Sequence, residues 1–236
     1  EKRCRIFDEF STEVQKELNR INDRESHYLE HYYEYRTDSM GNEIVPHDSI
    51  KKKELFYKNS GMEIVDLGEG IVEMNLQTKT YIKYVKLLPK YYQDYWYLIK
   101  DAENIAPDAA LVISWRELGN LLARHEAYVK TYPTKKEFFC RLQDDYIFLQ
   151  SVYLFGVDNT PVYYENIDKE VKKEWKRFIK AYPNSPTVPF IKDMLRIKSH
   201  EDMDAIRQKL TKFQEHSDYP LLKSCPGKIR TYSEEF

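Results

Sequence analysis

The residues best suited to chemistry are two histidines and a glutamate near the N-terminus. His27, Glu30 and His31 form an H-x-x-E-H pattern. On a helix this spacing places two imidazoles one turn apart with a carboxylate beside them, as in inverzincin-type zinc peptidases. A third metal ligand would have to come from far along the chain, and Glu103 and Glu126 are candidates. The alternative interpretation is that the two histidines border the apolar stripe of a long helix.

An aromatic stretch is the second candidate site. Five aromatic residues fall within seven positions: Tyr91, Tyr92, Tyr95, Trp96 and Tyr97. Seven residues span nearly two helical turns, so these rings cannot all face one side of a helix and some must lie at its edge. Exposed Tyr and Trp are favoured at protein interfaces and on saccharide-binding platforms. The alternative is that the stretch packs against the segment 37–75.

Two groups of oxygen-bearing side chains are weaker candidates. An acid pair for glycoside hydrolysis needs two carboxyls across a cleft, whereas acidic residues at a helix start favour the helix dipole and face solvent. The acidic residues in question are Glu165, Asp168, Glu170 and Glu174. The segment 158–160 lacks the repeated oxygen spacing of a calcium loop and is interpreted as an Asx-type turn. The sequence contains no Gly-rich phosphate loop, and we predict no catalytic residue and no cofactor.

Helical periodicity predicts the elements that would position these residues. Apolar residues recur at steps of three and four from Phe7 to Tyr35, which predicts one helix from about Arg5 to Arg36, or two with a kink near Asp23. The segment 37–75 breaks this pattern with turn residues and brief apolar runs separated by glycine. It is a non-repeat insert, and two structures are open for it: two or three short strands, or an irregular loop packed on the helices.

A short pattern recurs three times at the ends of apolar helical runs. It reads YVKLLP at 84–89, YVKTYP at 128–133 and FIKAYP at 178–183, and its prolines are 44 and 50 residues apart. We interpret it as the junction of stacked helical hairpins, because such hairpins cannot bury their apolar faces alone. The predicted fold class is therefore mostly α: a degenerate helical-hairpin array with a small irregular or β insert near the N-terminus. Capping boxes are predicted at Ser114 and Thr134, and a helix start at Ser199.

The third copy supports a family resemblance. Residues 178–185, FIKAYPNS, look like the F-x-x-x-YPNS junction of tetratricopeptide-type repeats in bacterial envelope lipoproteins. The resemblance covers about residues 76–198, and it implies a helical-hairpin scaffold and an envelope setting. The chain departs from that family in its repeat length, which is usually about 34 residues, and in lacking most of the small residues that allow close helix packing. The resemblance carries over no partner and no functional residue.

The predicted organisation follows from these segments. A long helix occupies 1–36, the insert 37–75, the helical hairpins 76–217 and an irregular tail 218–236. Cys140 is predicted to be a buried thiol, and whether Cys4 pairs with Cys225 is left open. The sequence begins at Glu1 without Met, which together with the resemblance predicts an extracytoplasmic protein: periplasmic, envelope-attached or secreted. On this prediction a leader has been removed, together with any lipid anchor that it carried.

Composition narrows the function. The net charge of −2 comes from 37 basic and 39 acidic residues, which argues against a nucleic-acid partner. No run reaches the ~18 apolar residues of a membrane helix. We predict a non-catalytic helical-repeat protein that binds another protein in the envelope or outside the cell. The alternatives are a metal-dependent hydrolase that uses residues 27–31 and a saccharide-binding protein that uses residues 91–97.

Overall fold

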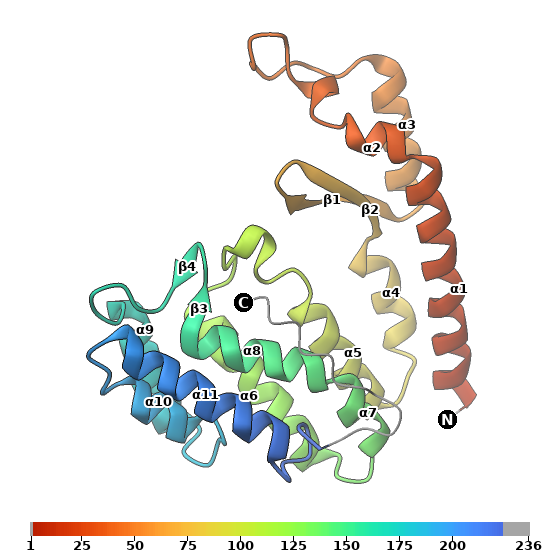
Figure 1. Cartoon of the computed structure of the whole chain (residues 1–236). Coiled ribbons are helices and arrows are strands. Elements are labelled where there is room, and N and C mark those ends of the chain that lie inside the picture. Colours follow the sequence, from red (N-terminus) through yellow and green to blue (C-terminus); the bar gives the residue numbers. More distant parts are fainter. Residues whose placement is uncertain (1, 224–236) are drawn as a thin grey trace. The chain divides into compact units, whose positions relative to one another are not determined.

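The protein is mostly α-helical, with two small antiparallel sheets, as the sequence predicts at this level. A computed structural model describes residues 2–223 (Figure 1). The internal contacts divide the chain into two compact units, residues 1–96 and 97–236. Within the described residues, every helix is too short or too polar to cross a membrane.

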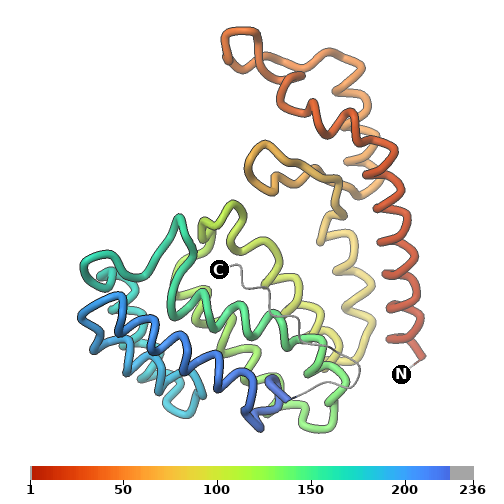
Figure 2. The backbone as a smooth tube through the Cα atoms, in the orientation of Figure 1, coloured from red at the N-terminus to blue at the C-terminus, as the bar shows by residue number. Residues whose placement is uncertain are grey.

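The first unit consists of helices around a β-hairpin. Its elements are α1 (Lys2–Arg24), α2 (Ser26–Glu30), a 3₁₀ turn (Glu34–Arg36), α3 (Asp48–Asn59), β1 (Met62–Gly68), β2 (Ile71–Leu76), α4 (Thr78–Val85) and the start of α5 (Lys90–Ala102). Figure 2 follows the chain from α1 through α2, back along α3 and into the hairpin. The helices α1 and α2 pack on β2, and α3 packs on β1. The hairpin is therefore the element that the helices of this unit share.

The predicted N-terminal helix is two helices with a break between them. Helix α1 ends at Arg24, and Glu25 leaves the helical region at φ −97°, ψ 9°. The Glu25 carboxylate accepts hydrogen bonds from Lys53 Nζ at 2.6 Å and from Tyr57 Oη at 2.7 Å. Both partners lie on α3, so the residue at the break also joins the first helix to the third. The second of the two sequence interpretations, a kink near Asp23, is the one observed.

The insert contains a helix that the sequence did not predict. The first of the brief apolar runs in the segment 37–75, residues 55–57, lies on α3 and not on a strand. The ring of His47 accepts a hydrogen bond from Ser49 N at 3.3 Å and begins this helix, and Gly61, at φ +81°, follows its end. The two later runs form β1 and β2, which pair in register from Met62 opposite Leu76. The strand interpretation is thus correct for these two runs only.

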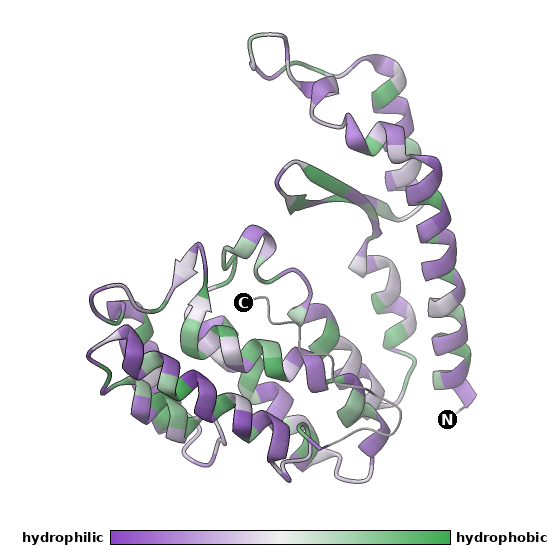
Figure 3. Ribbon diagram, in the orientation of Figure 1, coloured by the Kyte–Doolittle hydropathy of each residue, from purple (hydrophilic) through white to green (hydrophobic). Residues whose placement is uncertain are grey.

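Apolar side chains fix the hairpin on the helices. Met74 is fully buried among Leu18, Ile21 and Tyr57, and Val72 is buried against Tyr28 and Leu29. Alternate residues of each strand supply these contacts, as expected for a sheet covered on one face. Figure 3 shows the hydrophobic residues along both strands.

The second unit is a bundle of helices with one two-residue hairpin. It contains the end of α5, a 3₁₀ turn (Pro107–Ala109), α6 (Trp115–Thr131), α7 (Lys136–Arg141), α8 (Gln143–Phe155), β3 (Gly156–Val157), β4 (Thr160–Pro161), α9 (Lys169–Ala181), α10 (Val188–Met194) and α11 (His200–His216). Helix α6 packs on α8 and α9, and both α10 and α11 pack on α8. The largest fully buried side chains at the centre are Trp175, Tyr146, Tyr153 and Phe178.

Two of the three predicted helix starts are confirmed. Ser114 forms the complete capping box with Glu117, and the Ser199 side chain accepts a hydrogen bond from Asp202 N. The prediction at Thr134 is wrong, because α7 begins after Lys135 without a side-chain cap.

The recurring helix end is present twice among the described residues. Helices α6 and α9 are followed by Tyr132 and Tyr182, with φ/ψ of −127°/58° and −132°/58°. Each tyrosine N–H bonds the carbonyl four residues earlier, on Tyr128 or Phe178, and the ring centroids of the two pairs lie 5.0 and 4.9 Å apart. Helix α4 ends differently: its aromatic residue, Tyr84, is exposed rather than buried. A buried aromatic anchor therefore accompanies the shared geometry.

The cysteines differ from the prediction at one position. Cys4 is a free, buried thiol whose sulfur lies 3.6 Å from Tyr91 Oη. Cys140 is half-buried and disulfide-bonded, so the predicted buried thiol is wrong. Cys225 and the predicted tail beyond residue 223 lie outside the described residues.

Alkylation should distinguish the two described cysteines. After denaturation without reductant, iodoacetamide should label Cys4 and leave Cys140 unlabelled, because only Cys4 carries a thiol. Peptide mass spectrometry reads both positions, and reduction before labelling is the control that should expose Cys140. Full labelling of Cys140 without reductant would contradict the assignment.

Candidate binding surfaces

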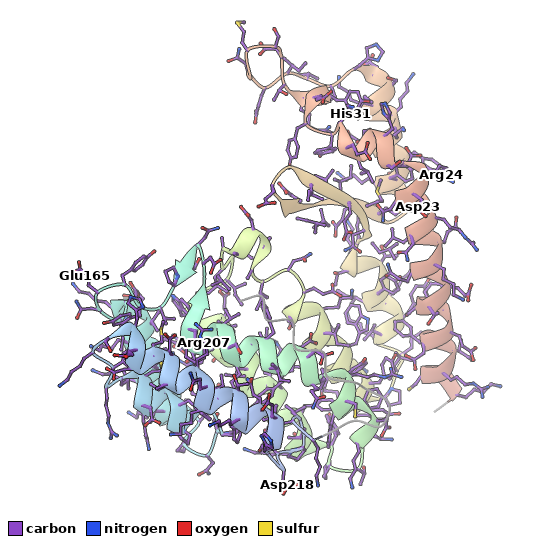
Figure 4. All side chains as sticks on the ribbon, in the orientation of Figure 1. Asp23, Arg24, His31, Glu165, Arg207 and Asp218 are labelled. Atoms are coloured by element: carbon purple, nitrogen blue, oxygen red, sulfur yellow. The ribbon has the colours of Figure 1, made fainter. Side chains whose placement is uncertain are left out.

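The histidine pair forms a stacked contact on α2. The rings of His27 and His31 lie 4.4 Å apart at 17°, and His31 Nδ1 is 2.8 Å from the carbonyl oxygen of His27. Glu30 is exposed. Figure 4 shows His31 at the end of α2, beyond Asp23 and Arg24. Among residues 2–223, no group of three or more His, Cys, Asp or Glu side chains is arranged to hold a metal ion.

Glu126, one of the candidate third ligands, is instead the centre of a buried polar cluster. One carboxylate oxygen accepts hydrogen bonds from Ser185 Oγ at 2.8 Å, Thr187 Oγ1 at 3.2 Å and Tyr146 Oη at 3.2 Å. Burial raises the pKa of this carboxyl, while the three hydroxyl donors oppose the shift. Ser185 is the last residue of the YPNS junction, so the cluster ties that junction to α6.

Removing one donor should measurably weaken this cluster. Ser185→Ala should lower the free energy of unfolding by about 1–2 kcal/mol, because the buried carboxylate loses its shortest hydrogen bond. Urea denaturation followed by circular dichroism would measure it. Ser39→Ala, at an exposed position, is the matched control and should change stability little. Equal stability of the two variants would argue against a structural role for the junction serine.

The four acidic residues near α9 have separate roles. Asp168 caps α9 by accepting hydrogen bonds from Glu170 N and Val171 N. Glu174 is buried and bonds both Tyr153 Oη and the Arg177 guanidinium, which it meets at 2.6 Å. Figure 4 shows Glu165 in the loop before α9. Two of the four side chains thus stabilise the helix and its packing.

The segment 158–160 binds backbone groups. Asn159 Nδ2 donates to the carbonyl of Asp108 at 2.7 Å, and Thr160 Oγ1 accepts from Leu111 N at 3.0 Å. These bonds attach the β3–β4 hairpin to the loop before α6. These bonds reach residues far away in the sequence, unlike the local Asx-type turn that the sequence favours.

The aromatic stretch at 91–97 is mostly enclosed. Tyr92, Tyr95 and Trp96 are buried, and Tyr91 and Tyr97 are half-buried. The Tyr92 ring packs edge-on against Phe7 at 5.9 Å, and its hydroxyl bonds Asp8 on α1. These contacts are with α1 rather than with the segment 37–75. Three of the five rings are therefore committed to packing.

A different aromatic surface of the first unit is exposed. Ile6 and Phe10 on α1, together with Tyr84 and Leu87 at the end of α4, are 42% to 64% exposed. The rings of Phe10 and Tyr84 are 5.9 Å apart, and Arg3 on α1 donates to the Leu87 carbonyl at 3.3 Å. Ile6 and Phe10 lie one turn apart on the same helix face. We call these four residues the α1–α4 patch.

The α1–α4 patch has a basic flank on the α4 side. Lys83 Nζ lies 4.8 Å from the centroid of the Tyr84 ring. The segment 77–93 contains four lysines and no acidic residue. Sequence reasoning missed this surface because Phe10 belongs to an apolar helix stripe and Tyr84 to the recurring motif, and both patterns predict burial. The segment 77–93, with four lysines and no acidic residue, was the sequence signal that could have indicated an exposed surface here.

Comparisons with protein-family models, with curated proteins and with solved structures found no match for this chain.

Proposed function

We propose that this protein is non-catalytic and binds another protein through the α1–α4 patch. The observation that carries the proposal is the contact between exposed apolar side chains of α1 and the end of α4. Scattered exposed apolar residues are ordinary on protein surfaces, whereas adjoining aromatic and aliphatic side chains within a charged border are typical of interfaces. The partner surface that fits has an apolar centre and acidic residues around it.

The second unit fits a scaffold role in this proposal. We infer that α6 with α8, and α9 with α10 and α11, are two helical hairpins stacked on each other. The repeated end of α6 and α9 and the packing between these helices support the inference. Likeness to the envelope lipoprotein repeats remains part of the proposal.

An extracytoplasmic location also belongs to the proposal. The disulfide at Cys140 supports it, because disulfides persist mainly in oxidising compartments.

A pull-down with paired variants tests the proposed function. The wild-type chain should recover one protein in stoichiometric amount from the envelope and secreted fractions of the source cells. Ile6→Ser with Leu87→Ser should abolish recovery, since both side chains are more than half exposed and lie in the patch. Leu55→Ser with Phe56→Ser, at similarly exposed positions on α3, is the matched control.

The same variants distinguish a loss of binding from a loss of folding and from self-association. Equal melting temperatures of the wild type and both variants would show that a loss of recovery is not a loss of folding. Recovery that survives in the Ile6/Leu87 variant would contradict the proposal. So would a wild-type dimer that the same substitutions dissociate, because the patch would then bind a second copy of the chain.

A further inference from the structure

The two edges of the β1–β2 hairpin differ in whether other residues bond their outward backbone groups. On the outer edge of β2, both backbone groups of Met74 bond the side chain of Asn22: the Met74 N–H donates at 2.7 Å and the carbonyl accepts at 3.0 Å. Asn22 lies on α1, so a helix side chain occupies the position that a further strand would take. That edge is closed at its centre.

The same bonds establish which backbone groups of β1 point outward. Ile64 is opposite Met74, and in an antiparallel pair whose members do not bond each other, both residues direct N–H and C=O away from the partner strand. The bond from Gln77 N to Gly61 O, at 2.8 Å, fixes the same alternation independently. The outward backbone groups of Ile64 and Asp66 have no hydrogen-bond partner outside the hairpin among the described residues. The edge of β1 is therefore open.

A groove accompanies the open edge. It has a volume of about 310 Å³ and lies between β1 and the helices, with Tyr32, Tyr57, Met62 and Ile64 among its lining residues. The Ile64 side chain faces the helices in this groove, and Glu63 faces the opposite side because successive residues of a strand alternate. A strand placed beside β1 would thus present one row of side chains to this groove, whose lining combines apolar residues with Glu54 and Lys58, and the other row to Glu63.

The charge of the hairpin determines which partner side chains are favourable in that second row. Residues 62–76 contain no Lys or Arg, and of their acidic side chains Glu63 and Glu73 lie on the face of this second row, whereas Asp66 lies on the face of Ile64 and accepts a hydrogen bond from Tyr33 Oη. Glu63, Glu69 and Glu73 form no ion pair with any described residue. We propose that the open edge of β1 binds an extended segment of a partner protein in which basic and apolar residues alternate. A second copy of β1 fits poorly, because its strand carries acidic and apolar side chains and no Lys or Arg.

This binding mode is strand addition, in which backbone bonds to Ile64 and Asp66 give affinity and the alternating side chains give specificity. It uses a different surface from the α1–α4 patch and does not depend on the function proposed for that patch. The Ile6/Leu87 variant should therefore bind such a segment as the wild type does.

A capped peptide of alternating lysine and valine is a direct probe. Isothermal titration with the full chain should detect binding, and the matched peptide of glutamate and valine should not bind. Glu63→Lys should weaken binding about tenfold, because an attractive pair becomes a repulsive one. Asp204→Lys, an equal charge change at an exposed position on α11, should leave binding unchanged. Ile64→Pro should abolish binding by removing the outward N–H without removing a bond to β2.

Three outcomes would overturn the proposal. Equal binding of the two peptides would show that the hairpin does not select basic residues. Equal weakening by Glu63→Lys and Asp204→Lys would show that binding responds to the net charge of the protein and not to the charge at residue 63. A wild-type chain that dimerises in light scattering, and that Ile64→Pro makes monomeric, would show that the edge pairs with a second copy. Glu63 is exposed, so its variant remains informative even if Ile64→Pro disturbs the hairpin.

Discussion

Replacing Gly156 with alanine is expected to cost about 3 kcal/mol or more of unfolding free energy. Gly156 ends α8 at φ +77° and ψ −162°, a backbone region that is essentially restricted to glycine. A Cβ at this position would lie 2.4 Å from the Thr160 carbonyl oxygen and 2.8 Å from Pro161 Cα. Both obstacles are backbone atoms of the tight β3–β4 hairpin, so neither can rotate away. Relief would require the hairpin to separate from the end of α8.

Gly41→Ala separates the clash from the conformational cost. Gly41 also has a positive φ, +83°, but a Cβ there would meet no atom within 4 Å. It should therefore lose only about 1 kcal/mol. Urea denaturation of both variants gives the comparison, and the difference of about 2 kcal/mol or more is the contribution of the clash. Similar losses of unfolding free energy in the two variants would mean that the β3–β4 hairpin moves to accommodate the Cβ at little cost.

Sequence patterns predicted the helices whose signals are local. Ser114 with Glu117 completes its cap within one turn, and Ser199 accepts a hydrogen bond from Asp202 N at the start of α11. Helix α3 was missed because its apolar residues are few and three successive lysines interrupt them. The contacts of Lys53 and Tyr57 with Glu25 hold this helix against the end of α1. Such contacts join residues about thirty positions apart, which periodicity does not encode.

The candidate surfaces were harder to predict, for a related reason. An aromatic residue gives the same signal in sequence whether it is buried or exposed. Trp96 is enclosed, while Tyr84, twelve residues earlier, is 42% exposed beside Phe10. Likewise, Asn22 of α1 bonds the edge of β2, whereas no described residue bonds the outward backbone groups of Ile64 and Asp66 on β1. Neither outcome follows from spacing, because each is decided by which helix reaches the site.

His125 should make the stability of the second unit depend on pH. Its side chain is fully buried on α6, Nδ1–H donates to the Leu121 carbonyl at 2.9 Å, and Nε2 has no hydrogen-bond partner among residues 2–223. Burial, with a smaller contribution from the charge of Arg124, lowers the pKa of this imidazole to about 4, against the opposing effects of the bond to Leu121 and the charge of Asp101. Protonation would place a charged N–H at Nε2 without an acceptor.

The sign of the effect follows from proton linkage. In the unfolded chain the imidazole takes up a proton near pH 6.5, whereas the folded protein resists protonation down to about pH 4. Acidification through this window therefore favours the unfolded state, with a loss of about 2 kcal/mol at pH 5 and about 3 kcal/mol near pH 4. Protonation of Glu126, whose pKa burial raises, acts in the opposite direction.

The contribution of His125 is isolated by comparing variants at two pH values. Unfolding free energies of the wild type and His125→Leu at pH 7 and pH 5 should show that the variant loses about 2 kcal/mol less on acidification. Glu126 is present in both proteins, so its opposing effect cancels in the difference. His216→Gln, at an exposed position at the end of α11, should behave as the wild type. If His125→Leu retains the full loss at pH 5, another group binds the proton, and the buried imidazole is not the source of the acid sensitivity.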